Sequence, residues 1–391
     1  MNILIPFPYV REGGGGIANF IRNFSKQAAA LGHAVTIVTS LHPGEKPEER
    51  LDGVTYRRLA FAHKRFFRRI RDYPAFSKLV QAELKKGTLP HDVMLGVSYA
   101  ALAGVGKNLV YRSAGGPVHW EMTMWQRLWR EGYASTNFLK RLAIRTDFKL
   151  QERMERTAVK AAKALLCQSK DIAKGFKETY GTSVPVNIPC TGVDTKEFAP
   201  RKSALKDELG IKGPLILLTG GCSIVKGAPI LERAIPFILT LHPDVTIAIA
   251  GSQLYDLQLA PEHQERVRLL GHIDHKHLPT YYNAADIFLF PSVFNEGFPN
   301  AVLEAMASGC AIVTTRLPGI EEYLAEDVSA EIVETYDPHG LAQGVIRLLE
   351  SPKLRATLGK NARKASLTFD WKTVAPDICA FIERVCLPSK Q

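Results

Sequence analysis

The chain is 391 residues long, which is enough for two domains that each bury a core of their own. Its composition, 46% hydrophobic and 23% charged, is that of an ordinary globular protein. No apolar run approaches the roughly 20 residues of a membrane-spanning helix, and the first residues lack the features of a signal peptide. These observations predict a cytoplasmic protein. The six cysteines are scattered without a C-x-x-C pair, which argues against a metal cluster or a disulfide framework.

The net charge of +11 is concentrated in the first half of the chain. Residues 1–200 contain 31 Lys and Arg against 17 Asp and Glu, whereas residues 201–391 contain 19 against 22. This asymmetry predicts a polyanionic partner for the first half. An anionic membrane or a phosphorylated glycolipid fits best, and nucleic acid is not expected.

Two segments of the first half could contact such a partner. Residues 57–71 contain seven Lys and Arg, no acid and several phenylalanines. A helix over residues 64–71 would present a basic amphipathic surface to anionic lipid, although a solvated charged face is the alternative. Residues 120–129 contain three of the four tryptophans and could form a membrane- or acceptor-binding flap, although aromatic stripes also belong to cores.

The first elements predict a β-α-β unit with a glycine-rich turn. A strand over residues 2–7 is followed by the glycines of residues 13–16, a helix over residues 17–31 and a strand over residues 34–39. The turn lacks the third glycine of the dinucleotide fingerprint. It is either a flexible turn or a loop that lets a ligand approach the backbone.

Further strands are predicted at residues 92–97 and 108–111, followed by a polar loop at residues 112–121. Ligands bind at the carboxyl ends of strands in open α/β sheets. His119 is the only histidine of this loop and could act on an acceptor proton, or it could be incidental. A long charged helix is predicted over residues 148–164, and the turn-rich residues 185–214 are the predicted linker.

The second half repeats the alternation of strands and helices. A strand at residues 215–219 leads into G-G-C-S-I-V-K-G at residues 220–227 and then into a helix. A glycine turn with Lys226 before a helix N-terminus is a plausible phosphate cradle, but it is not a Walker A loop. The pattern predicts two doubly wound parallel α/β sheets. The predicted domains are residues 1–188 and 189–370, with a last helix over 371–391 that returns to the first domain.

The most informative stretch is N-E-G-F-P-N-A-V-L-E-A-M-A-S-G at residues 295–309, which holds Glu296 and Glu304. A buried strand is predicted before it, and a helix over residues 301–307 within it. A loop carboxylate, a helix N-terminus and a helix carboxylate in series could hold a hydroxyl, a phosphate and a hydroxyl. A sugar nucleotide presents those groups in that order. The alternative is that Glu296 merely favours the helix dipole.

Across these motifs the chain resembles the family-4 retaining glycosyltransferases of the GT-B fold. The resemblance runs in order through the glycines at 13–16, P-C-T-G-V-D-T-K-E-F-A-P at 189–200, the turn at 220–227, G-H-I at 271–273 and the glutamate pair. It implies two Rossmann-like domains that face a central cleft. It also implies sugar transfer from a UDP- or GDP-linked donor to a lipid-linked or cell-surface glycan, with no metal and no other cofactor.

The resemblance also implies roles for individual residues. Glu296 would face the donor sugar, Lys226 would neutralise the diphosphate, and Glu304 would accept from the ribose hydroxyls. The implied catalytic residues are Glu296, Lys226 and His119. The implied donor-binding residues are Gly15, Gly16, Gly220, Gly221, Lys226, Glu296, Gly297, Phe298, Asn300, Ala301, Val302 and Glu304. The enzyme would lie in the cytoplasm or peripherally on the inner face of the cytoplasmic membrane.

The chain departs from the family pattern at three positions. Gly221 stands where the family has an arginine, so phosphate binding would depend more on Lys226. The family's first-domain histidine directly follows a strand, where this chain has Arg112, Ser113 and Ala114 and reaches His119 only later. Thr191 replaces a common asparagine. These departures leave two alternatives: a sugar-nucleotide epimerase or hydrolase on the same fold, and a basic membrane- or nucleic-acid-binding protein with a degenerate site.

Overall fold

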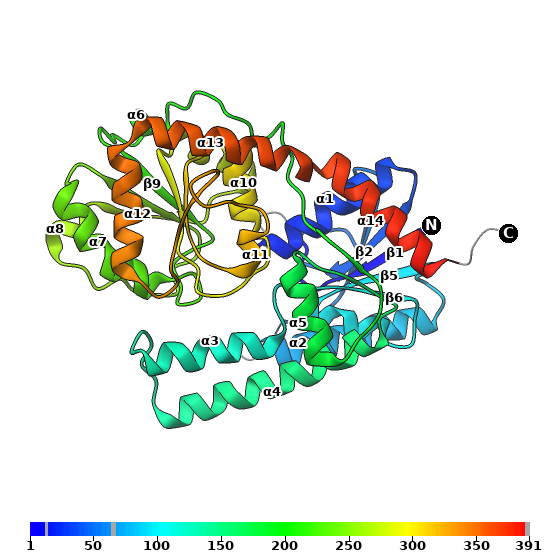
Figure 1. Cartoon of the computed structure of the whole chain (residues 1–391). Coiled ribbons are helices and arrows are strands. Elements are labelled where there is room, and N and C mark those ends of the chain that lie inside the picture. The colour runs from blue at the N-terminus through cyan, green and yellow to red at the C-terminus, as the bar shows by residue number, and fades with distance from the viewer. Residues whose placement is uncertain (12–14, 64–67, 388–391) are drawn as a thin grey trace. The chain divides into compact units, whose positions relative to one another are not determined.

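The computed structural model of the chain describes residues 1–11, 15–63 and 68–387. The chain forms two compact units (Figure 1). The first unit contains Met1–Thr123, Thr136–Gly192 and Trp371–Gln391, and the second contains Met124–Ser135 and Val193–Asp370. Residues 12–14 of the predicted glycine turn and residues 64–67 of the predicted basic helix lie outside the described residues.

The described part of the first unit holds an eight-stranded sheet in the order β3-β4-β2-β1-β5-β6-β7-β8. All neighbouring strands are parallel except β3 and β4, which are antiparallel. Its central strands are apolar and buried on both faces, as parallel sheets covered by helices require. The strands are β1 (Asn2–Pro6), β2 (Ala34–Ser40), β3 (Glu48–Leu51), β4 (Val54–Leu59), β5 (Val93–Val97), β6 (Leu109–Arg112), β7 (Ala164–Leu166) and β8 (Val186–Asn187).

The helices of the first unit connect these strands, and the last one comes from the C-terminal end of the chain. The helix α14 packs on α1, where the ring of Trp371 lies 5.8 Å from that of Phe20. Asn108 Nδ2 also donates to the carbonyl of Cys386 at 2.9 Å. The helices are α1 (Gly16–Ala30), α2 (Arg68–Lys85), η1 (Ser98–Gly104), α3 (Val118–Arg130), α4 (Phe138–Ala161), α5 (Lys170–Tyr180) and α14 (Trp371–Cys386). Only the first part of α3 belongs to this unit, since the residues from Met124 on are part of the second unit.

The second unit holds a six-stranded parallel sheet in the order β11-β10-β9-β12-β13-β14. The strands are β9 (Leu215–Thr219), β10 (Thr246–Ala250), β11 (Val267–Gly271), β12 (Ile287–Phe290), β13 (Ile312–Thr315) and β14 (Glu331–Val333). The helices are α6 (Leu205–Glu208), α7 (Ala228–Leu241), α8 (Pro261–Gln264), η2 (His275–His277), α9 (Leu278–Ala284), α10 (Asn300–Ser308), α11 (Pro318–Glu321), α12 (Pro338–Glu350), α13 (Pro352–Ser366) and η3 (Leu367–Phe369).

The strand order of each sheet reverses direction at one point. In the second unit the chain moves outward from β9 to β11 and then starts again on the other side of β9 with β12. In the first unit the same reversal lies between β1 and β5. Loops that leave the carboxyl ends of strands on either side of such a point diverge and leave a crevice, where α/β proteins bind ligands. The turn with Lys226 follows β9, and the loop with Glu296 follows β12.

Two predicted elements differ from those observed. The charged helix α4 begins at Phe138, ten residues before the predicted start, because the Asn137 side chain caps it by accepting from the Lys140 amide at 2.9 Å. The predicted polar loop at residues 112–121 is also shorter than expected, since α3 begins at Val118. His119 therefore lies in the first turn of a helix and not in a loop.

Candidate active site

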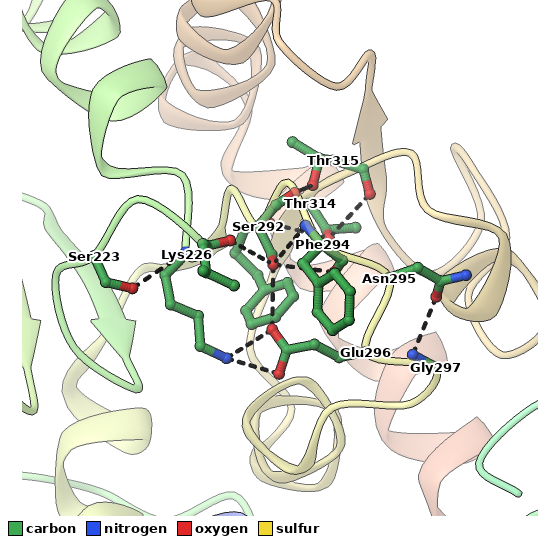
Figure 2. A network of polar contacts seen from close by, with 11 residues as sticks. Ser223, Lys226, Ser292, Phe294, Asn295, Glu296, Gly297, Thr314 and Thr315 are labelled. Carbon is green, nitrogen blue, oxygen red and sulfur yellow. Dashed lines mark hydrogen bonds and ion pairs between the residues drawn. The ribbon is translucent and has the colours of Figure 1, made fainter. Parts of the chain in front are cut away.

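The second unit brings Lys226 and Glu296 together, although 70 residues separate them in the chain. Lys226 Nζ donates to both carboxylate oxygens of Glu296, each at 2.7 Å (Figure 2). The two side chains are 26% and 22% exposed, so the pair is partly desolvated but remains open to a ligand. Lys226 Nζ also lies 5.4 Å from the centre of the Phe290 ring at the end of β12. The pair thus lies where the loops after β9 and β12 meet.

The glycines of the turn after β9 place Lys226. Gly220, Gly221 and Gly227 all have positive φ, at 95°, 90° and 78°. A Cβ at Gly221 would lie 2.5 Å from the carbonyl oxygen of Ser252, and one at Gly227 would lie 1.8 Å from that of Pro291. No other residue fits these two positions. The structure thereby explains why Gly221 cannot be the arginine that the family has there.

Ser292 holds Glu296 from the other side. Its side chain is fully buried, and its hydroxyl lies 3.2 Å from Glu296 Oε1 and 3.2 Å from the Val225 carbonyl (Figure 2). The Ser292 carbonyl in turn accepts from the Thr315 hydroxyl at 2.5 Å. One buried residue therefore connects the loop of Glu296 to the turn of Lys226 and to β13, which restricts where the carboxylate can move.

The N-terminus of α10 directly follows this loop. Its N-cap residue is Pro299, which has no side-chain group that could bond the first amides of the helix. Two amides of the predicted phosphate- and sugar-binding set already have partners: the Gly297 amide donates to Asn295 Oδ1, and the Val302 amide donates to the Pro299 carbonyl, each at 3.1 Å. The side chain of Phe298 is buried in a stack with Tyr323, so only its backbone could contact a ligand.

Glu304 is the fifth residue of α10, about one turn from the start of the helix, and is 7% exposed. Its Oε2 accepts from the Tyr282 hydroxyl at 2.9 Å, and its Oε1 lies 2.9 Å from Nε2 of His275. The Tyr282 hydroxyl is also 2.8 Å from the Thr219 hydroxyl at the end of β9. Burial, together with the neighbouring Glu304 carboxylate, raises the pKa of Tyr282 well above its usual value, so this tyrosine stays a neutral donor.

Sequence reasoning did not find His275, Tyr282 or Ser292. His275 belongs to a short 3₁₀ turn, Tyr282 to the helix α9 and Ser292 to the loop after β12. No spacing rule links these elements to Glu304 or Glu296, because only the packed sheet brings them together. The signal that was available is their position in the chain next to β12, since Tyr282 lies shortly before this strand and Ser292 shortly after it. Ligands bind at the carboxyl ends of such strands.

The first unit contains the remaining predicted site residues. Gly15 is the N-cap of α1, and a Cβ at this position would have no neighbouring atom within 4 Å, whereas Gly16 begins the helix. His119 Nδ1 lies 3.4 Å from the Thr179 hydroxyl, and burial lowers the pKa of His119. His119 and the Lys226–Glu296 pair belong to different units.

A buried carboxylate holds the helix that carries His119. Glu155 Oε2 accepts from the Val118 amide at 2.9 Å, and Glu155 Oε1 accepts from the Tyr111 hydroxyl at 2.9 Å. The Tyr180 hydroxyl also donates to this carboxylate. Burial raises the pKa of Glu155 to about 6, while these hydrogen bonds act in the opposite direction. The first turn of α3 is therefore anchored to α4 by its own first amide.

The tryptophans of the predicted flap belong to α3. Trp120 fills the space of absent side chains, since a Cβ at Gly116 or at Gly175 would lie 2.3 Å from its ring. Trp129 is only 9% exposed. The sequence left open whether these tryptophans form a flap or belong to a core, and their burial favours the core.

Neither a metal cluster nor a membrane-spanning helix is found in the described part of the chain. No group of three or more His, Cys, Asp or Glu in residues 1–11, 15–63 and 68–387 is arranged to hold a metal ion. In the same described ranges, no helix is both long enough and apolar enough to cross a membrane.

Comparison with known families identifies the class of enzyme as a glycosyltransferase. Residues 14–197 match the family model described as Glycosyltransferase Family 4, and residues 202–365 match the model described as Glycosyl transferases group 1. The two matches follow one another and together cover most of the chain. The chain therefore belongs to the family-4 glycosyltransferases, and the GT-B fold predicted from the sequence is confirmed.

Two curated relatives illustrate the range of the family. Spore coat protein SA of Bacillus subtilis (strain 168) is 26% identical over 405 residues, which cover 97% of this chain and 97% of that protein. The phosphatidyl-myo-inositol mannosyltransferase of Mycolicibacterium smegmatis is 30% identical over 218 residues. That match covers 55% of this chain and 56% of the relative, so it spans about half of each protein.

Solved structures show the same fold at lower identity. The sucrose-phosphate synthase of Thermosynechococcus elongatus superposes with a TM-score of 0.79 at 19% identity, covering 98% of both chains. HepE of Anabaena, solved in complex with UDP-glucose, superposes with a TM-score of 0.71 at 17% identity and covers 98% of this chain and 100% of its own.

Proposed function

We propose that this glycosyltransferase moves a sugar from a UDP- or GDP-linked donor to a lipid-linked or cell-surface glycan, with retention of configuration. The observation that carries the proposal is the Lys226–Glu296 pair beside the N-terminus of α10. A cation and a helix N-terminus together suit a diphosphate, and a carboxylate next to them suits sugar hydroxyls. Polysaccharide or lipopolysaccharide synthesis would use such a reaction.

In this proposal the donor separates the ion pair between Lys226 and Glu296 when it binds. The diphosphate takes Lys226 from Glu296, and the released carboxylate accepts from the donor's sugar hydroxyls. Before the donor binds, the ammonium and the carboxylate neutralise each other, so neither charge is buried without a partner. The amides of Phe298, Asn300 and Ala301, together with the glycines at 220 and 221, would complete the donor site. The amides of Gly297 and Val302 would contribute only by exchanging their present partners, Asn295 and Pro299, for the donor. Gly15 and Gly16 would let the donor approach the first unit's backbone.

Glu304 would bind the ribose with the lone pairs that its protein partners leave. A carboxylate has about four lone-pair sites, and Tyr282 and His275 occupy one on each oxygen. One site therefore remains on each oxygen, which matches two neighbouring hydroxyl groups. His275 and Tyr282 would keep the carboxylate in this orientation.

The chemistry requires stabilisation of a leaving group. The bond from the anomeric carbon to the phosphate oxygen breaks, and the diphosphate leaves with the electron pair. The acceptor oxygen then bonds to the same carbon on the face that the phosphate leaves, and the acceptor proton passes to a phosphate oxygen. Fixed cationic and amide donors lower this barrier without a metal. Each well-placed donor raises the rate by ~10²–10³-fold. His119 would assist on the acceptor side.

The relatives support the donor and acceptor classes. HepE binds UDP-glucose in its solved complex, and the mycobacterial relative is named for mannosyl transfer to a phosphatidyl-inositol. A lipid acceptor also agrees with the excess positive charge of residues 1–200. The proposed location of the enzyme is therefore the cytoplasm or the inner face of the cytoplasmic membrane.

Calorimetry with UDP, GDP and a panel of their sugars tests the donor class. Binding of one nucleoside diphosphate at micromolar to low millimolar concentration is expected, and no binding at all would favour a basic membrane- or nucleic-acid-binding protein with a degenerate site. Activity that persists in excess EDTA is expected for a metal-independent enzyme. Proton NMR of the product gives the anomeric configuration, and inversion would contradict the proposed mechanism.

A second measurement separates transfer from the alternative reactions on this fold. A transferase should consume its donor slowly until an acceptor is added. An epimerase or hydrolase would convert the donor at full rate without any acceptor, and that result would replace the proposed reaction.

A further inference from the structure

The first four turns of α4 expose an unusual number of large apolar side chains. Phe138 is 75% exposed, Leu139 is 73%, Leu142 is 51% and Leu150 is 38%. At about 100° per residue these four side chains lie on one side of the helix. We call them the α4 apolar face. Contiguous exposed apolar groups mark interaction sites more often than ordinary surface.

The opposite side of α4 is anchored in the first unit. Phe148, Gln151 and Glu155 are buried, and Glu155 bonds to Tyr111, to Tyr180 and to the first amide of α3. The N-terminal end of α4 extends away from the sheet of that unit (Figure 1). The apolar face is therefore presented by a rigid helix that is held by its other side and capped by Asn137.

The residues around the α4 apolar face are mostly basic. Between positions 138 and 151 the helix carries Lys140, Arg141, Arg145 and Lys149, and its one acid is Asp147. A helix with aromatic and leucine side chains on one side and lysines and arginines beside them is suited to the interface of an anionic bilayer. The apolar groups enter the acyl boundary while the long basic side chains reach the headgroups.

We infer that the α4 apolar face docks this enzyme on an anionic lipid surface. The inference rests on the membrane-surface location proposed above, and it names the element that inserts. The excess positive charge of residues 1–200 would add long-range attraction, whereas α4 would add apolar insertion that salt does not screen. A second copy of this chain is a poorer occupant, because a symmetric dimer through this face would bring the same cations together.

Co-sedimentation of the full-length chain with vesicles tests the inference. We expect binding to vesicles of phosphatidylcholine with phosphatidylglycerol and weak binding to phosphatidylcholine alone. The variant Phe138→Ser/Leu139→Ser/Leu142→Ser should lower the partition coefficient by about tenfold or more, since three large apolar side chains no longer insert. Lys140→Gln/Arg145→Gln should lower it by roughly fivefold for each charge removed.

Matched substitutions elsewhere on the surface are the controls. Leu241→Ser/Leu254→Ser/Val328→Ser removes three apolar side chains that are 63%, 78% and 54% exposed in the second unit. Lys353→Gln/Lys360→Gln removes two exposed charges of α13. Neither control should change vesicle binding, and thermal unfolding should show that every variant is folded.

Three outcomes would overturn the inference. These are unchanged vesicle binding by the triple serine variant, no binding of the wild-type chain to anionic vesicles, and a solution dimer that the triple variant dissociates while vesicle binding stays the same. Nucleoside-diphosphate binding by calorimetry is measured on the same proteins. Its absence in the wild-type chain would contradict the proposed function and leave the lipid result standing, so the two failures are distinguishable.

Discussion

The two carboxylates of the stretch at residues 295–309 are held in different ways, although only seven residues lie between them. Glu296 lies in a loop, is 22% exposed and has both oxygens on the ammonium of Lys226. Glu304 lies within α10, is 7% exposed and bonds to a tyrosine hydroxyl and an imidazole nitrogen. The first carboxylate is balanced by a charge, and the second is held by directional hydrogen bonds.

This difference indicates different uses. An ion pair at a partly open position can separate when an incoming anion takes the cation, because the charge balance is kept. A buried carboxylate with directional partners loses much more when it moves, so it acts as a fixed acceptor. We therefore expect Glu296 and Lys226 to rearrange on donor binding, and Glu304 to stay in place.

The largest effect should come from the pair itself. Lys226→Ala and Glu296→Ala should each lower the rate of sugar transfer by ~10²-fold or more, on the scale of a lost charge-stabilising group. Circular dichroism and thermal unfolding should show a folded protein in both cases. Near-normal turnover in either variant would remove that residue from the proposed site.

Glu155 is another buried carboxylate, 4% exposed, and its hydrogen bonds described above come from two tyrosine hydroxyls and a backbone amide. Burial raises its pKa from 4.5 to about 6, so the folded state binds its proton more tightly than the unfolded state does. The unfolding free energy should therefore fall by about 2 kcal/mol as pH rises from about 4.5 through about 6. Urea denaturation across this range measures the change.

The control for this pH dependence is Glu155→Gln, which cannot titrate. The difference between the pH slopes of the wild-type chain and the variant isolates the carboxyl group, whatever the variant does to overall stability. Equal slopes would mean that Glu155 does not titrate in this window.

The proposed orientation of Glu304 predicts how the site distinguishes riboses. The wild-type chain should bind its nucleoside diphosphate about tenfold more tightly than the 2′-deoxy analogue, the scale of one charge-assisted hydrogen bond. His275→Ala should reduce this ratio, because the carboxylate loses one of its two orienting partners. Calorimetry with both nucleotides measures the ratio.

A merely structural role for His275 gives a different result. Both nucleotides would then bind more weakly by the same factor, and the ratio between them would not change. Glu304→Ala, which has no acceptor oxygen at this position, is the reference variant for complete loss of the discrimination.

The smallest effect is expected from Tyr282→Phe. Removing this hydroxyl takes one hydrogen-bond partner away from Glu304 Oε2 and one from the Thr219 hydroxyl. The unfolding free energy should fall by about 1–2 kcal/mol, as for other buried polar groups that lose a partner. Sugar transfer should fall less than in the Lys226 variant. A larger loss of transfer than in Lys226→Ala would reverse the roles assigned to the two carboxylates.

Much of the second unit could be predicted from local sequence. The strand at residues 215–219 has the predicted bounds, and α10 extends the predicted helix over residues 301–307 by one residue at each end. Strands that are buried on both faces are uninterrupted apolar runs bounded by glycine, so the signal is strong over a few residues. The contact between Lys226 and Glu296 needed the strand order as well, because only the order of the sheet places the loops after β9 and β12 next to each other.

Other features could not be predicted in this way. The start of α4 at Phe138 precedes the predicted one because its first turns are exposed and apolar, which violates the periodicity that identifies helices in globular domains. The helical position of His119 depends on Glu155, which lies 37 residues beyond the amide that it caps. The start of α4 has one local signal, the N-cap Asn137, whereas the helical position of His119 has none within the window that local propensity covers.

The sequence by itself determined the fold class, the order of the elements and the two carboxylates with Lys226, because these depend on local hydrophobic patterns and on short motifs. Only the tertiary structure decided how each carboxylate is held. Ser292, Thr219, His275 and Tyr282 come from separate elements, and hydrogen bonds across a packed sheet have no fixed spacing along the chain. It also decided that residue 221 must be glycine, since the Ser252 carbonyl fills the space of any side chain there.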